Sequence, residues 1–189
     1  MNRLLIVLLS VFCWGSDNLL TGVAVAQDLP TAVVEKEHVW LQKFAGEWTT
    51  ESEGTAGPGQ PSIECKGTVK SKMLGQFWVI NEIENDVQGV QMKGLQTIGY
   101  DSESKKFVGT WVDNMLNHLW KYEGAVDESG TTLRLEADGP NFAEPGKVAK
   151  FRDAYEFVSD DHIIATSSMQ GADGKWVTFM TGHMHRVTK

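Results

Sequence analysis

The feature that most constrains this chain is a long succession of short β-type segments that begins at Trp48 and continues almost to the C-terminus. Apolar and polar residues alternate within these segments, as they do in strands with one buried face. Clusters of Gly, Asp and Ser, such as residues 101–104, 127–130 and 171–174, separate the segments and are typical of turns. One short helical turn, over residues 40–44, precedes the first strand.

Short links between successive segments imply that sequence neighbours pair antiparallel. A long meander of this kind leaves no exposed edge when its first and last strands pair. The sequence therefore predicts an all-β fold, a single antiparallel up-and-down barrel of about ten strands with a short N-terminal helix. A β-sandwich is the alternative. After Trp48, the expected strands cover residues 63–73, 77–85, 90–100, 105–113, 116–126, 131–137, 148–158, 162–169 and 175–187.

The first 26 residues have the pattern of a signal peptide. Arg3 supplies a positive start, residues 4–12 form an apolar core too short to span a bilayer, and Ala24-Val25-Ala26 offers a cleavage site. An uncleaved anchor and lipidation at Cys13 are alternatives, the second weakened because Phe12 stands where a small residue is needed.

We therefore divide the chain into a signal peptide (1–26), an N-terminal arm (27–37) and a barrel domain (38–189). We expect a periplasmic or secreted protein with no membrane span after cleavage.

Charge narrows the choice of partners. The formal net charge is −8 and the pI is near 5.1, which disfavours nucleic acid and anionic lipid surfaces as partners because both require a basic face. After cleavage, Cys65 is the remaining cysteine, so the barrel cannot depend on an internal disulfide. Cys65 alternates with apolar and small residues and is interpreted as a small buried side chain.

Several stretches resemble a bacterial family catalogued as domain of unknown function 1579. They are residues 44–48 (Phe-Ala-Gly-Glu-Trp), residues 73–77 (Met-Leu-Gly-Gln-Phe), the segment from Gly99 to Asp113, and the end from Gly174 to Arg186. The resemblance implies a calycin-like barrel and brings no assigned catalytic residue.

The short helix followed by Gly46-Glu47-Trp48 is similar to the opening of the calycins, the lipocalin-like barrels. In the wider lipocalin pattern, an Arg near the end of the barrel packs over this Trp. The resemblance assigns that role to Arg186 over Trp48, and a solvated Arg186 is the alternative.

A set of polar and aromatic residues falls on predicted inward faces. Lys106, Lys121 and Glu123 are expected to face solvent, so the residues alternating with them face inward. The inward set comprises Asn81, Trp111, Asp113, His118, Trp120, Tyr122, Asp153 and Tyr155. Buried polar groups need hydrogen-bond partners, so these groups either satisfy one another or line a ligand cavity.

We favour a cavity that binds a small apolar or amphipathic molecule inside the barrel. Trp111, Trp120 and Tyr122 would supply the wall, and Asn81, Asp113 and His118 would orient the ligand. The competing interpretation is a fully packed barrel that acts as an envelope or interaction protein with no small ligand.

Two histidines near the C-terminus, His183 and His185, share one strand face and form the weak metal candidate. The face of that strand is ambiguous, because odd positions such as Phe179 and even positions such as Met180 are both apolar. A haem-binding barrel of the nitrobindin type, with a late His as axial ligand, is a further alternative. It is weakened because residues 49–53 lack the repeated glycines of that family's opening.

Catalytic motifs are absent from the sequence. It contains no Gly-x-Ser-x-Gly elbow, no Walker loop, no His-Glu-x-x-His and no paired Cys-x-x-Cys. An acid–base pair of His118 with Asp113 is the enzymatic alternative. The sequence favours binding over catalysis and leaves the identity of any cofactor unknown.

Overall fold

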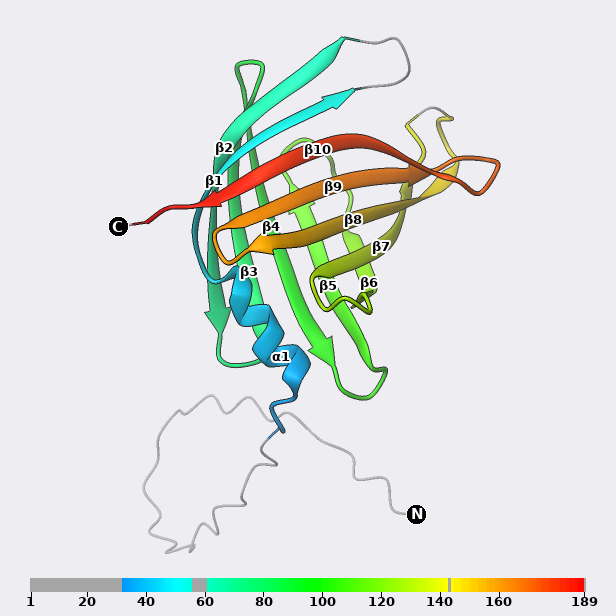
Figure 1. The fold of residues 1–189 in the computed structure, drawn as a ribbon. Helices are drawn as coiled ribbons and strands as arrows, with labels where there is room; N and C mark the ends of the chain where they lie inside the picture. The colour runs from blue at the N-terminus through cyan, green and yellow to red at the C-terminus, as the bar shows by residue number, and fades with distance from the viewer. Residues whose placement is uncertain (1–31, 56–60, 143, 189) are drawn as a thin grey trace, which may run out of the picture. The chain divides into compact units, whose positions relative to one another are not determined.

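The computed structural model describes residues 32–55, 61–142 and 144–188, so the predicted signal peptide lies outside the described residues. A helix, α1 (Lys36–Leu41), and a 3-10 turn, η1 (Gln42–Phe44), precede ten strands (Figure 1). No helix in the described part is long and apolar enough to cross a membrane. The strands are β1 (Gly46–Thr55), β2 (Ser62–Leu74), β3 (Trp78–Val87), β4 (Val90–Asp101), β5 (Lys106–Asp113), β6 (Trp120–Val126), β7 (Thr132–Pro140), β8 (Val148–Ser159), β9 (His162–Gln170) and β10 (Trp176–Arg186).

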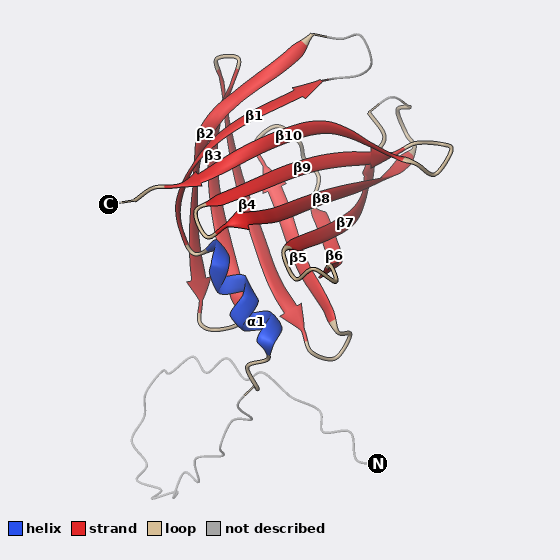
Figure 2. Cartoon of the chain, in the orientation of Figure 1, coloured by secondary structure: helices blue, strands red, loops and turns tan. Residues whose placement is uncertain are grey.

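The strands form one closed barrel in which each pairs antiparallel with its sequence neighbours. Closure comes from the pairing of β1 with β10, which runs from Trp48 opposite Arg186 to Gly54 opposite Met180. Figure 2 shows the strands wrapped around the barrel axis and α1 at one end. The up-and-down barrel predicted from the sequence is confirmed, and the sandwich is excluded.

Alternating burial explains why these segments form strands of a barrel. In β3, for example, Val79, Asn81 and Ile83 are buried, whereas Glu82 and Glu84 between them are exposed. Side chains on a strand point alternately to the two faces, so one face fills the barrel and the other meets water.

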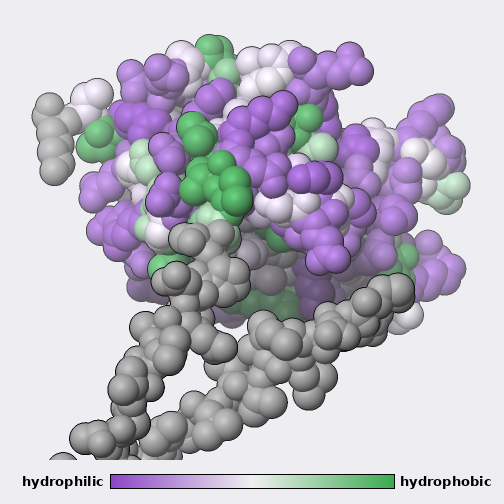
Figure 3. Space-filling view, turned by 90° about the horizontal axis from the view of Figure 1, so that it is seen from below, coloured by the Kyte–Doolittle hydropathy of each residue, from purple (hydrophilic) through white to green (hydrophobic). Residues whose placement is uncertain are grey.

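The helical segment closes one end of the barrel. Leu41, Phe44 and Trp48 are at most 1% exposed, and burial of each contributes about 1.5–3 kcal/mol to folding. The indole Nε1 of Trp48 donates to the carbonyl of Phe44 at 2.8 Å. Viewed from the end that carries α1, the surface is mostly hydrophilic with a compact hydrophobic patch (Figure 3).

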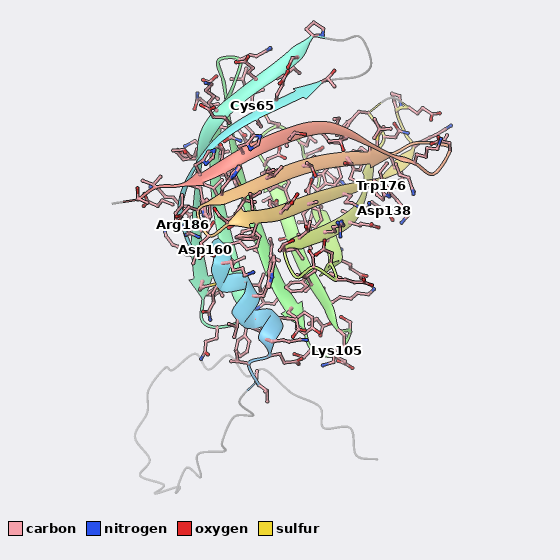
Figure 4. All side chains as sticks on the ribbon, in the orientation of Figure 1. Cys65, Lys105, Asp138, Asp160, Trp176 and Arg186 are labelled. Carbon is pink, nitrogen blue, oxygen red and sulfur yellow. The ribbon has the colours of Figure 1, made fainter. Side chains whose placement is uncertain are left out.

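Arg186 joins the end of β10 to the helical segment. Its guanidinium carbon lies 4.1 Å from the centre of the Trp48 ring, and its nitrogens donate to the carbonyls of Ala45, Lys43 and Asp160. Figure 4 shows Arg186 beside Asp160, which lies in the turn between β8 and β9. The predicted packing of Arg186 over Trp48 is confirmed.

One predicted strand boundary is wrong by four residues, whereas the others differ from the observed boundaries by at most three. β6 begins at Trp120 and not at Leu116, and residues 114–119 form a loop. The carboxylate of Asp113 accepts hydrogen bonds from the backbone N–H groups of Met115 and Leu116 at 2.7 and 2.8 Å, which turns the chain away from the strand. Leu116 is 39% exposed, so it does not belong to the barrel core.

The ambiguous face of β10 has a structural cause. The register of β10 against β9 shifts between Thr178 and Met180, which marks a β-bulge. Phe179 and Met180 both line the barrel interior. Trp176 instead lies against Arg152, whose guanidinium carbon is 3.9 Å from the centre of the Trp176 ring. The apolar pattern therefore follows odd positions at the bulge and even positions after it, where Met184 is buried.

Candidate functional site

The interior of the barrel contains a cavity of about 320 Å³ at the end opposite α1. Leu116 and Phe142, from the loops that follow β5 and β7, are exposed at its mouth. Most of the wall is apolar. Besides these two residues, its apolar side chains are Val87, Met92, Trp111, Trp120, Phe151, Ala165, Phe179 and Met180.

Two tryptophans from neighbouring strands form one side of the cavity. Trp111 on β5 and Trp120 on β6 are directly opposite in the strand register. Glycines make room for both rings: a Cβ at Gly94 would lie 2.6 Å from the Trp111 ring, and a Cβ at Gly139 would lie 2.1 Å from the Trp120 ring. The Trp120 ring also packs edge-to-face on Phe151, with 4.9 Å between ring centres.

The polar part of the wall centres on Asp153. Its two carboxylate oxygens accept hydrogen bonds from the hydroxyls of Tyr122 and Ser167, at 2.6 and 2.7 Å. Burial raises the pKa of Asp153, and these two hydrogen bonds oppose that rise. Burial and the neighbouring carboxylate likewise raise the pKa of Tyr122.

A second hydrogen-bond network lies next to the cavity and reaches it through Tyr155. The amide of Asn81 donates to Gln96 at 2.9 Å, and the amide of Gln96 donates to the Tyr155 hydroxyl at 2.9 Å. Asn81 and Gln96 are buried, at 4% and 2% exposure, and neither lines the cavity. The structure thus places Asn81 behind the wall, where it supports Tyr155.

Asp113 and His118 do not form the pair considered from the sequence. Besides its two bonds to backbone N–H groups, the Asp113 carboxylate accepts a bond from the Trp111 indole at 2.7 Å. His118 lies in the loop before β6, with its ring edge-to-face on Trp120 at 4.8 Å. Its Nε2 is buried without a hydrogen-bond partner among the described residues. The expectation that His118 points inward from a strand is wrong, because the strand starts two residues later.

Four of the six predicted site residues meet at the cavity, and they are Trp111, Asp113, Trp120 and Tyr122. Sequence reasoning missed Phe151 and Gln96, although each continues an alternation that was visible. Phe151 precedes Asp153 and Tyr155 at the same spacing, and Gln96 lies between the outward Lys93 and the buried Ile98 on the inward face.

The late histidines lie on the outer surface of the barrel. His183 and His185 are exposed and stack with His162 of β9, whose Nε2 lies 2.9 Å from Nδ1 of His183. Neither can reach a ligand inside the barrel, so haem held in the cavity by a late His is not supported. Within the described ranges, no group of three or more His, Cys, Asp or Glu side chains is arranged to hold a metal ion.

A closed antiparallel barrel with a helical segment at one end and a cavity at the other defines the class of lipocalin-like barrels. A family model described as "Protein of unknown function (DUF1579)" matches residues 34–186, and the chain belongs to this family. No curated protein matches the sequence.

Solved structures support the same architecture. The protein Rv2717c from M. tuberculosis superposes with a TM-score of 0.61 at 12% identity, over 82% of this chain and 100% of that chain. The S-type phycobiliprotein lyase CPES from Guillardia theta superposes with a TM-score of 0.55 at 12% identity, over 80% of this chain and 92% of that chain. At this level of identity, the likeness shows the fold alone.

Proposed function

We propose that this protein binds one small apolar or amphipathic molecule inside its barrel. The observation that supports this is the cavity of about 320 Å³, which has a largely apolar and aromatic wall and a few polar groups around Asp153. Ligand sites in proteins share this composition, and their volumes run from about 300 to 1,000 Å³. The cavity also counts against a fully packed barrel that acts only as an interaction protein.

Tryptophan fluorescence provides the direct test, because Trp111 and Trp120 both line the cavity. The purified protein is titrated with isoprenoids, fatty acids and tetrapyrroles, and at least one is expected to give a saturable change in emission. The same compound should raise the melting temperature, because a ligand that binds only the folded state stabilises it. Replacing both residues (Trp111→Phe, Trp120→Phe) should remove most of the emission change and leave the thermal shift.

A cavity-filling variant separates binding in the barrel from binding elsewhere. Ala165 lines the cavity, and Ala165→Phe would place a ring inside it. This variant is expected to fold and to lose the saturable response. A flat response of the unmodified protein across the whole panel would favour the packed-barrel interaction protein instead.

We further propose that the protein is exported and cleaved after Ala26. The supporting features are Arg3, the apolar residues 4–12 and the Ala24-Val25-Ala26 site. Intact-mass measurement of the protein from its own host should give a mature N-terminus at Gln27 or within a residue or two of it. Retention of Met1 on a cytoplasmic protein, or an acylated Cys13, would contradict this proposal.

A further inference from the structure

The ionisable groups on the cavity wall are all acids, with no base among them. Asp113 and Asp153 contribute carboxylates, and among the described residues no Lys, Arg or His side chain lines the cavity. Neither carboxylate takes part in any ion pair found in the described part of the chain. A ligand that enters the cavity therefore meets negative or acceptor groups and no compensating cation.

The hydrogen-bond donors that contact Asp113 and Asp153 are already occupied. The hydroxyls of Tyr122 and Ser167 donate to Asp153, and the indole of Trp111 donates to Asp113. A carboxylate on a ligand would have to compete for these donors. It would also lie near two acids in a low-dielectric interior, where repulsion between like charges is several times stronger than in water.

The carboxylates on the wall, in contrast, can still accept further hydrogen bonds. A carboxylate offers about four lone-pair positions. Asp153 accepts two hydrogen bonds, from Tyr122 and Ser167, whereas Asp113 accepts three, of which two come from the backbone. Asp153 is thus the carboxylate with more unused capacity, and its bonds to Tyr122 and Ser167 hold it in one orientation.

We propose that the cavity selects an apolar molecule carrying an amine, which donates its N–H groups to Asp153, and that it discriminates against carboxylate ligands. This inference rests on the proposed function and specifies the chemical class of its ligand. The amine would supply the cation that Asp153 lacks, and the apolar part would lie against Trp111 and Trp120. Hydrogen bonds between charged groups are stronger than those between neutral ones, which favours an ammonium head over an alcohol.

The test compares decylamine, decanol and decanoate, which share a ten-carbon tail and differ in the head group. Dissociation constants are measured by the emission of Trp111 and Trp120 and by calorimetry. Decylamine is expected to bind at least tenfold more tightly than decanoate, with decanol between them. In Asp153→Asn, the advantage of decylamine over decanol should fall to less than threefold.

Two controls keep the result specific. An acidic protein attracts amines to its surface, so Ala165→Phe, which keeps the net charge, must lose the saturable decylamine response. Asp138→Asn removes an exposed carboxylate and must keep the preference of the unmodified protein. The comparison of the three head groups on the unmodified protein remains decisive even if Asp153→Asn does not fold.

The outcomes separate this inference from the proposed function. Decanoate binding as tightly as decylamine, or an amine preference that persists in Asp153→Asn, would overturn the selection for amines and leave ligand binding intact. If none of the three compounds binds and the wider panel is also silent, the proposed function fails and the inference fails with it.

Discussion

The ring of Trp120 lies directly over Gly139, so closely that a Cβ at position 139 would come within 2.1 Å of the indole. The two residues come from β6 and β7, in the part of these strands where the backbones no longer pair: the register between them runs only from Glu123 opposite Glu136 to Val126 opposite Leu133. The indole fills the space that the missing pairing leaves, and it forms the cavity wall on its other side.

Gly139→Ala should therefore disturb both the packing and the cavity. Trp120 is 7% exposed and cannot move away freely, so we expect a loss of about 1–3 kcal/mol in the free energy of unfolding, as for other overpacked sites. Urea denaturation measures it. Gly171→Ala, in the turn after β9, is the control, and its effect should stay below about 1 kcal/mol in either direction. Equal effects of the two changes would contradict the packing of Trp120 on Gly139.

Trp120 and Lys121 are adjacent in the sequence and lie on opposite faces of β6. Trp120→Ala should cost about 3–5 kcal/mol, because it removes a large buried side chain and enlarges the cavity. Lys121→Ala should change the stability by less than about 0.5 kcal/mol, as for an ordinary surface site. Thermal and urea unfolding of the two variants measures this difference, and similar costs would show that the alternation is misassigned.

Arg186 should contribute more to stability than an exposed arginine does. Arg186→Ala removes a cation over the Trp48 ring and three hydrogen bonds to backbone carbonyls, and we expect a loss of about 2–3 kcal/mol. Arg186→Lys should recover less than half of this, because an ammonium cannot reproduce the planar fork. The control is Arg134→Ala, which breaks a partly exposed ion pair with Asp127 and should cost less than about 1 kcal/mol. Equal losses for the two alanine variants would refute this role of Arg186.

The barrel could be predicted from the sequence because its signals are local and repeated. Alternation such as that around Asn81 and Glu82 assigns a face to each strand, and the turns set the order of the strands. Closure of the barrel was predicted from the short links between successive strands. The resemblance to the lipocalin pattern, which placed Arg186 over Trp48, supported this prediction. These features depend on the period of the pattern and on the length of each link, and both can be read along the chain.

The errors in the prediction arise where a local contact overrides the alternation of inward and outward residues. His118 has the same spacing from Trp120 and Tyr122 as a strand residue would have. The side chain of Asp113 nevertheless bonds to the backbone two and three residues later, which ends the strand and puts His118 in a loop. The bulge before Met180 in β10 acts similarly, because one extra residue exchanges the inward and outward positions.

The cavity itself could not be predicted, because its volume depends on how side chains from many strands meet. Trp111 occupies the space above Gly94, and Trp120 occupies the space above Gly139. Each pair joins two strands, and the sequence alone does not show which residues of two paired strands lie opposite each other. The hydrogen bond from Tyr122 to Asp153 also crosses the interior, from β6 to β8. Alternation predicted that both side chains point inward, but their contact required the three-dimensional structure.

The last prediction concerns Asp153 and the dependence of protein stability on pH. Burial raises the pKa of Asp153 in the folded protein above its value of about 3.9 in the unfolded chain. Between these two pKa values the unfolded chain has lost the proton and the folded protein keeps it. The free energy of unfolding therefore falls as the pH rises through this interval, by at most about 1.4 kcal/mol per pH unit, and levels off above the folded pKa.

Asp153→Asn cannot ionise, so it should lack this part of the pH dependence. Urea denaturation from pH 4 to pH 8 should show that the unmodified protein loses stability relative to Asp153→Asn as the pH rises. Asp138→Asn, which alters an exposed carboxylate beside Lys150, should run parallel to the unmodified protein over the same range. A profile of Asp153→Asn that is also parallel would mean that the Tyr122 and Ser167 hydrogen bonds fully offset the effect of burial, and the prediction would be wrong.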